Sequence, residues 1–210
     1  RTEAGLSAWT LQLDINALAK LYKTPTAVFM AELGIRTTPR LRKDIKRSRT
    51  APDKHYAEHR HQEIADFGKG TALRRHELRQ VRAKDVYEVD GLLYVRVNQG
   101  KGGKPREVLV RPEYRDHVLK LSQAKNNPDQ LPFAADQIPC RLPEHRYRAE
   151  YALAMYESIA RPLETLQHKE KYFCRADKKG TVYDREAMLV VSRYLGHNRV
   201  DVIAYSYLQK

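Results

Sequence analysis

The feature that most constrains the fold is a change of hydrophobic period near the middle of the chain. In LLYVRV, the apolar residues Leu93, Val95 and Val97 alternate with other side chains, which is typical of a strand with one buried face. The glycine-rich turn QGKGGKP follows, and REVLV resumes the alternation, so this stretch predicts an antiparallel hairpin or meander. The flanking segments repeat their apolar residues at helical intervals. The sequence therefore predicts an α+β fold, mainly helical with a small antiparallel sheet.

Two helices are expected before this sheet-forming domain, in LSAWTLQLDINALAKLYK and TPTAVFMAELG. Two helices of this size do not make a domain, and the chain opens with Arg1 rather than Met. We therefore expect residues 1–38 to be the C-terminal part of a helical domain with its linker, and residues 39–210 to be a second domain. Within the latter we expect a helix, a break at Gly68 and Gly70, a second helix from about Arg75, and mostly helices beyond the sheet.

The charge balance points to a polyanionic partner. Lysine and arginine number 39 against 26 acidic residues, a net charge of +13 with a pI near 9.7. Such an excess in a folded domain favours nucleic acid, although a merely soluble basic protein is the alternative. There is no apolar run of membrane-spanning length, no signal peptide is expected, and the two cysteines suit a reduced compartment. We expect a cytoplasmic protein with no membrane association.

Four short motifs carry residues suited to phosphate chemistry. TALRRHEL places Arg74 at a helix entrance, with Glu77 three residues later to orient it. GKGGKP puts Lys101 at a hairpin tip, where flanking glycines permit close approach. Each motif also has an ordinary interpretation, as a surface ion pair or a solvated turn.

The other two motifs follow the sheet. HRYR places His145 and Arg148 on one face at a helix start, which favours an anion. YLGHNRV supplies His197, with Tyr205 and Tyr207 behind it. Each is weak alone, and it is their order along the chain that is informative.

That order resembles the tyrosine recombinase family, the phage-type integrases, over roughly residues 40–208. TALRRHEL resembles the first arginine box, GKGGKPR the lysine hairpin, HRYR the His-x-x-Arg box, and LGHNRV…YL the last box. HRYRAEYA and LGHNRVDVIA look most like integrases of conjugative transposons and related integrative elements. The sequence departs from compact members in two ways. An insertion spans approximately 160–185, and the tyrosines lie eight and ten residues after the histidine, where nine is common; SYL favours Tyr207, with Tyr205 as second choice.

The resemblance implies a site-specific recombinase that cleaves and rejoins DNA through a covalent 3′-phosphotyrosine, integrating or excising a mobile element. Arg74, Arg148 and His197 would stabilise the phosphate's developing charge, and His145 would donate a hydrogen bond or help accept the tyrosine proton. Lys101 would protonate the leaving hydroxyl, and Tyr207 would be the nucleophile.

The resemblance also implies the partners. These are double-stranded DNA, three further protomers in a tetramer on two DNA sites, and an accessory DNA-bending or excisionase protein, with no metal and no cofactor. A basic stretch would grip the DNA backbone: Arg36, Arg40, Arg42, Lys43, Lys46, Arg47 and Arg49. Two alternatives stay open, a type IB topoisomerase-like enzyme and a non-catalytic DNA-binding regulator on the same scaffold.

Overall fold

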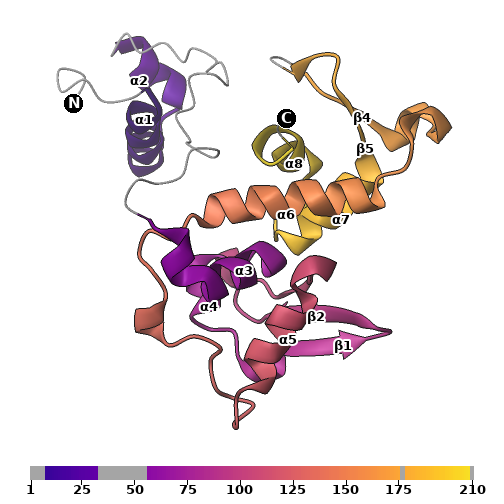
Figure 1. Cartoon of the computed structure of the whole chain (residues 1–210). Helices are drawn as coiled ribbons and strands as arrows, with labels where there is room; N and C mark the ends of the chain where they lie inside the picture. The colour runs from indigo at the N-terminus through magenta and orange to yellow at the C-terminus, as the bar shows by residue number, and fades with distance from the viewer. Residues whose placement is uncertain (1–7, 33–55, 176–177, 209–210) are drawn as a thin grey trace. The chain divides into compact units, whose positions relative to one another are not determined.

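The computed structural model describes residues 8–32, 56–175 and 178–208, which fall in two compact units, Arg1–Lys46 and Arg47–Lys210 (Figure 1). In the first unit, α1 (Ala8–Tyr22) and α2 (Thr26–Glu32) form in the two segments expected to be helical. Rings of Tyr22 and Phe29 lie 6.3 Å apart between the two helices. The expected domain boundary at 38/39 lies outside the described residues and stays a prediction.

A three-stranded antiparallel sheet forms where the period changes. Its strands are β1 (Val86–Val89), β2 (Leu92–Val97) and β3 (Arg106–Leu109), in that order across the sheet. The first turn, Asp90-Gly91, has positive φ at both residues, as two-residue hairpins prefer. Val95 pairs with residues of both neighbouring strands and is fully buried, which confirms the alternation read from the sequence.

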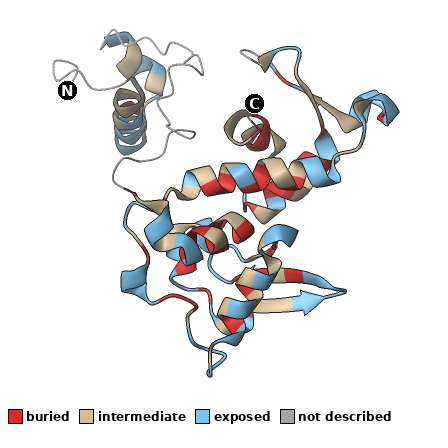
Figure 2. Ribbon diagram, viewed as in Figure 1, coloured by how far each residue is buried: buried red, intermediate tan, exposed pale blue. Residues whose placement is uncertain are grey.

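Helices supply the rest of the second unit's core. Six α-helices are described there: α3 (Gln62–Thr71), α4 (Arg75–Leu78), α5 (Arg115–Gln123), α6 (Glu144–Ile159), α7 (Arg185–Tyr194) and α8 (Val200–Ser206). Short 3₁₀ turns connect them: η2 (Glu58–His61), η3 (Ala83–Asp85), η4 (Lys101–Gly103), η5 (Pro112–Tyr114), η6 (Ala135–Gln137), η7 (Leu163–Thr165) and η8 (His168–Glu170). Helix α6 crosses the middle of the unit, packing on α3 and α7, and its buried residues face this core (Figure 2). The predicted α+β class is confirmed.

The predicted break at Gly68 and Gly70 is wrong, because α3 runs through both glycines. A Cβ on Gly68 would lie 3.0 Å from the Tyr147 ring, and one on Gly70 would lie 2.6 Å from Cβ of Tyr114. These glycines therefore let α6 and η5 pack closely against α3. The chain leaves the helix at Ala72, whose φ of 52° is left-handed.

Residues 160–185, expected to be an insertion, contain a second antiparallel sheet that the sequence did not predict. Its strands β4 (Lys171–Phe173) and β5 (Val182–Asp184) are three residues each, too short to show an alternating pattern. Cys174, directly after β4, is buried, and Cys140 is exposed.

Within the described segments, no helix combines the length and the apolar composition that a membrane crossing requires.

Candidate active site

Arg74 occupies the entrance of α4 in extended backbone conformation. Its backbone N–H donates to Oε2 of Glu77 at 2.8 Å, and its Nη1 donates to Oε1 at 3.1 Å. Because a first-turn carboxylate satisfies an unpaired amide of the helix, Glu77 caps α4 and orients the arginine at once. The pairing expected from TALRRHEL is confirmed.

The Leu-Gly-His turn ends α7 in a Schellman motif. Gly196 has φ +72°, its N–H donates to the Arg193 carbonyl, and the His197 N–H donates to the Ser192 carbonyl, both at 2.9 Å. Glycine is favoured here because this backbone conformation costs other residues free energy. The turn directs the chain at His197 into the cluster of arginines.

The carbonyl of Leu195, in the same turn, joins two arginines. Arg148 Nη2 donates to it at 2.8 Å and Arg74 Nη2 at 3.4 Å, while Arg148 Nη1 donates to the Ala72 carbonyl at 2.5 Å. Arg148 is only 1% exposed. Since a guanidinium carries five N–H groups, these carbonyls orient the arginines and leave further donors on each.

Tyr207 lies against this cluster. Its hydroxyl is 3.0 Å from Nε2 of His197, and the two rings lie 5.5 Å apart at 50°. The guanidinium carbon of Arg148 is 5.9 Å from the centre of the Tyr207 ring, within the range of a cation–π contact. The last box therefore brings its histidine and this tyrosine together beside a buried arginine.

Tyr205 lies elsewhere. Its hydroxyl donates to the Arg175 carbonyl at 2.8 Å and accepts the Arg175 N–H at 2.6 Å. Tyr205 lies within α8, whereas Tyr207 is its C-cap residue, with φ −126° and ψ −43° outside the helical region. One tyrosine therefore faces the arginines and the other the β4–β5 hairpin.

The pKa of His197 reports the charge around it. It falls from 6.5 to about 4, first because the ring is buried and then because of the positive charges of Arg148, Arg74, Lys101 and Arg106. The imidazole is therefore neutral at pH 7. Burial also lowers the pKa of Arg148, an effect that the Tyr207 side chain opposes.

Arg106, at the start of β3, is a residue of this site that sequence reasoning missed. Its two terminal nitrogens each donate to one oxygen of Glu77 at 2.7 Å, and its Nε donates to the Tyr194 carbonyl at 2.8 Å. Burial alone would raise the pKa of Glu77, but Arg106 and Arg74 outweigh it and lower the value to about 2. Arg106 thus ties β3 to the helix start at Arg74 and the helix end before Gly196.

Two glycines, Gly100 and Gly196, make room for the Arg106 side chain. A Cβ on Gly100 would lie 2.8 Å from Arg106 Nη1, and one on Gly196 would lie 3.2 Å from Arg106 Cδ. Two glycine-containing motifs far apart in sequence leave room for one side chain, which only the folded chain reveals.

The remaining predicted residues are placed as follows. Lys101 is exposed on the β2–β3 turn, near enough for its charge to act on His197. His145 is exposed in the first turn of α6, one turn before the buried Arg148. The proposed DNA-gripping residues Arg36, Arg40, Arg42, Lys43, Lys46, Arg47 and Arg49 lie outside the described residues.

Among the residues that the structure describes, no three His, Cys, Asp or Glu side chains gather closely enough to hold a metal ion.

Comparison with known proteins gives structural neighbours only. No family model matches the sequence, and no curated protein matches it. Among solved structures, the chain is similar to the XerH site-specific recombinase bound to difH substrate in a pre-cleavage complex, with a TM-score of 0.43 and 17% identity. It is similar also to XerH bound to palindromic difH in a post-cleavage complex, with a TM-score of 0.44 and 17% identity. Both alignments cover 76% of this chain but only 45% of the XerH chain, so the chain spans less than half the length of these proteins.

Proposed function

We propose that this protein is a tyrosine recombinase, which cleaves and rejoins DNA strands through a covalent 3′-phosphotyrosine on Tyr207. The observation that carries the proposal is the 3.0 Å contact between the Tyr207 hydroxyl and His197, beside two arginines whose guanidinium groups share the Leu195 carbonyl. A nucleophile held among phosphate ligands is the arrangement that phosphoryl transfer requires.

The arginines bind the scissile phosphate. Attack by an oxygen nucleophile builds negative charge on the non-bridging oxygens, and fixed guanidinium donors stabilise that charge. Arg74 and Arg148 reach the site already oriented by Glu77 and by backbone carbonyls, so little reorganisation is needed when DNA binds. Neutral His197 adds a ring nitrogen that can donate to the phosphate in one tautomer.

In the reaction, Tyr207 Oη forms a bond to phosphorus as the bond from phosphorus to the 5′ oxygen breaks. Lys101 protonates the departing 5′ oxygen, and the tyrosine proton passes to the neutral imidazole of His197, whose Nε2 lies 3.0 Å from the Tyr207 hydroxyl. The phosphodiester energy is kept in the phosphotyrosine, so attack by a second 5′-hydroxyl reverses the step and rejoins DNA without an energy source.

The proposal includes the assembly that acts on DNA and the role of the reaction in the cell. Four protomers assemble on two duplexes, the basic residues between Arg36 and Arg49 hold the DNA backbone, and an accessory DNA-bending or excisionase protein assists. HRYRAEYA and LGHNRVDVIA favour the integrases of conjugative transposons as the nearest branch, and hence the integration or excision of a mobile element. Positive net charge supports DNA as the partner.

The test uses a pool of randomised nicked duplexes, in which cleavage near the nick releases a short fragment and traps the protein on DNA. We expect denaturant-resistant adducts, with mass spectrometry placing the nucleotide on Tyr207. Tyr205→Phe is the matched control and should form the adduct, whereas Tyr207→Phe should not. An adduct on Tyr205 would refute Tyr207 as the nucleophile. DNA binding without any adduct would refute the proposed DNA-cleaving activity.

Sequencing the trapped DNA then supplies the target for a second assay. Two labelled duplexes carrying that target should yield exchanged products if the protein is a recombinase. Relaxation of supercoiled plasmid without exchange between duplexes would instead indicate a nicking-closing enzyme.

A further inference from the structure

The β4–β5 hairpin is anchored firmly at its base. Asp184, at the end of β5, accepts hydrogen bonds from Arg161 Nε at 2.8 Å and Nη2 at 2.9 Å, and it caps α7 by accepting the Glu186 N–H at 3.0 Å. Its own N–H donates to the Tyr156 hydroxyl of α6 at 2.9 Å. The hairpin therefore projects from α6 and α7 as an arm with a fixed origin.

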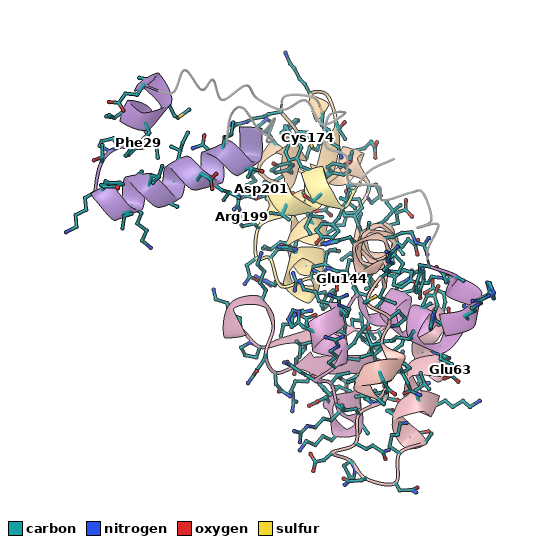
Figure 3. All side chains as sticks on the ribbon, turned by 90° about the vertical axis from the view of Figure 1, so that its left-hand side faces the viewer. Phe29, Glu63, Glu144, Cys174, Arg199 and Asp201 are labelled. Atoms are coloured by element: carbon teal, nitrogen blue, oxygen red, sulfur yellow. The ribbon has the colours of Figure 1, made fainter. Side chains whose placement is uncertain are left out.

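The hairpin contacts the carboxyl end of α8 from its turn and from β5. Lys178 Nζ donates to the Ala204 carbonyl at 2.6 Å and also to the Leu208 carbonyl, and the Tyr183 hydroxyl donates to the Leu208 carbonyl at 3.1 Å. The Arg175 backbone, which follows β4, holds the Tyr205 hydroxyl. Figure 3 labels Cys174 of this hairpin and Asp201 of α8, which lie in the same region of the molecule.

These contacts supply hydrogen-bond partners at the carboxyl end of α8. The last carbonyls of a helix have no partner within the helix, and a cation there is favoured by the helix dipole. A helix of seven residues is too short to be stable by itself, and Tyr207 is its C-cap residue. Its position therefore depends on what holds its carboxyl end.

The lysine is itself held in place. Lys178 Nζ lies 5.7 Å from the centre of the Tyr183 ring, and that ring packs edge-on against Tyr156 of α6, with centroids 5.6 Å apart. A continuous set of contacts thus runs from α6 through the hairpin to the carbonyls on either side of Tyr207.

We propose that the β4–β5 hairpin clamps α8 within the same protomer, and that Lys178 is a positioning residue that keeps the Tyr207 hydroxyl against His197. Lys178 touches neither DNA phosphate nor the reacting atoms in this role; it acts through the Ala204 and Leu208 carbonyls. The inference rests on the proposed function of Tyr207. It assigns the β4–β5 hairpin a role in positioning the nucleophile for cleavage.

The test compares Lys178→Met, Lys178→Arg and the neighbouring Lys179→Met. Lys179 is exposed, so the last variant removes the same charge from the same turn without touching α8. At saturating nicked DNA we expect Lys178→Met to form the adduct about ten- to a hundredfold more slowly, the cost of a nucleophile misplaced by about 1 Å. Lys178→Arg should recover most of the rate, and Lys179→Met should match the wild type.

Hydrogen exchange distinguishes failure of this inference from failure of the proposed function. The N–H groups of Tyr207 and Leu208, both bonded to the Ile203 carbonyl, should exchange faster in Lys178→Met than in Lys179→Met, whether or not the protein cleaves DNA. If wild type forms no adduct, the proposed function fails while exchange still tests the clamp. Equal cleavage rates and equal exchange in the two Met variants would overturn the clamp.

A second variant, Tyr183→Phe, tests the clamp even if Lys178→Met fails to fold. Tyr183→Phe keeps the ring and removes only the hydroxyl donated to Leu208. We expect an unchanged melting temperature within about 3 °C and slower adduct formation at saturating DNA; an unchanged rate would count against the clamp.

Discussion

Glu77→Gln tests whether the buried carboxylate is what holds the arginines of the site. The Glu77 side chain is 0% exposed and accepts four hydrogen bonds, two from Arg106 and two from Arg74. Glutamine keeps the shape, but it loses the charge and turns an amide N–H₂ toward a guanidinium. The substitution therefore leaves Arg106 buried without its counter-charge.

The expected magnitude follows from two independent arguments. The pKa of Glu77 falls from 4.5 to about 2 in the folded protein, which corresponds to about 3 kcal/mol of stability at neutral pH. Breaking a buried ion pair by removing one partner costs about 3–5 kcal/mol. We expect Glu77→Gln to lower the free energy of unfolding by about 3 kcal/mol in urea titrations at pH 7, followed by far-ultraviolet circular dichroism.

Glu113→Gln is the matched control. Glu113 pairs with Arg111 at the same 2.7 Å, but its side chain is 58% exposed, so the same substitution should cost less than about 1 kcal/mol. Because the folded state lowers the pKa of Glu77, its contribution is present above pH 4.5 and is lost as pH falls toward 2; the Gln variant should lack this loss. Equal stabilities for the two variants at pH 7 would refute the reasoning.

Three further predictions concern the same unit. The His197 ring should titrate near pH 4 by NMR, and because the unfolded chain takes up its proton near pH 6.5, the contribution of this group to stability should fall as pH drops from about 6.5 to 4; DNA phosphate should raise that pKa. Gly70→Ala should cost about 1–3 kcal/mol in urea unfolding, since its Cβ would lie 2.6 Å from Tyr114 Cβ, and no loss would mean that α3 and η5 are not so closely packed. Asp184→Ala removes the cap of α7 and the partner of Arg161 and should cost about 2 kcal/mol by the same measurement; a change below about 0.5 kcal/mol would mean that the cap and the pair contribute little.

Strands and helix starts could be predicted from this sequence because they depend on residues that are close together in the chain. The strand alternation of Leu93, Val95 and Val97 needs only a period of two, and the start of α4 at Arg75 needs only the turn before it. Gly68 and Gly70 misled for the opposite reason. A glycine that makes room for a tyrosine distant in sequence looks, in the sequence, like a glycine that ends a helix.

The sequence by itself determined the α+β class, the short sheet, and the order of arginine, lysine, histidine and tyrosine motifs. Its resemblance to a family favoured Tyr207 over Tyr205, but the residues gave no physical reason for that choice, because the two tyrosines lie only two positions apart at the end of α8. The tertiary structure turns Tyr207 to His197 and Tyr205 to Arg175. It also brings Arg106 to Glu77 and Lys178 to α8, since the folded chain alone sets which distant charges and carbonyls meet away from water.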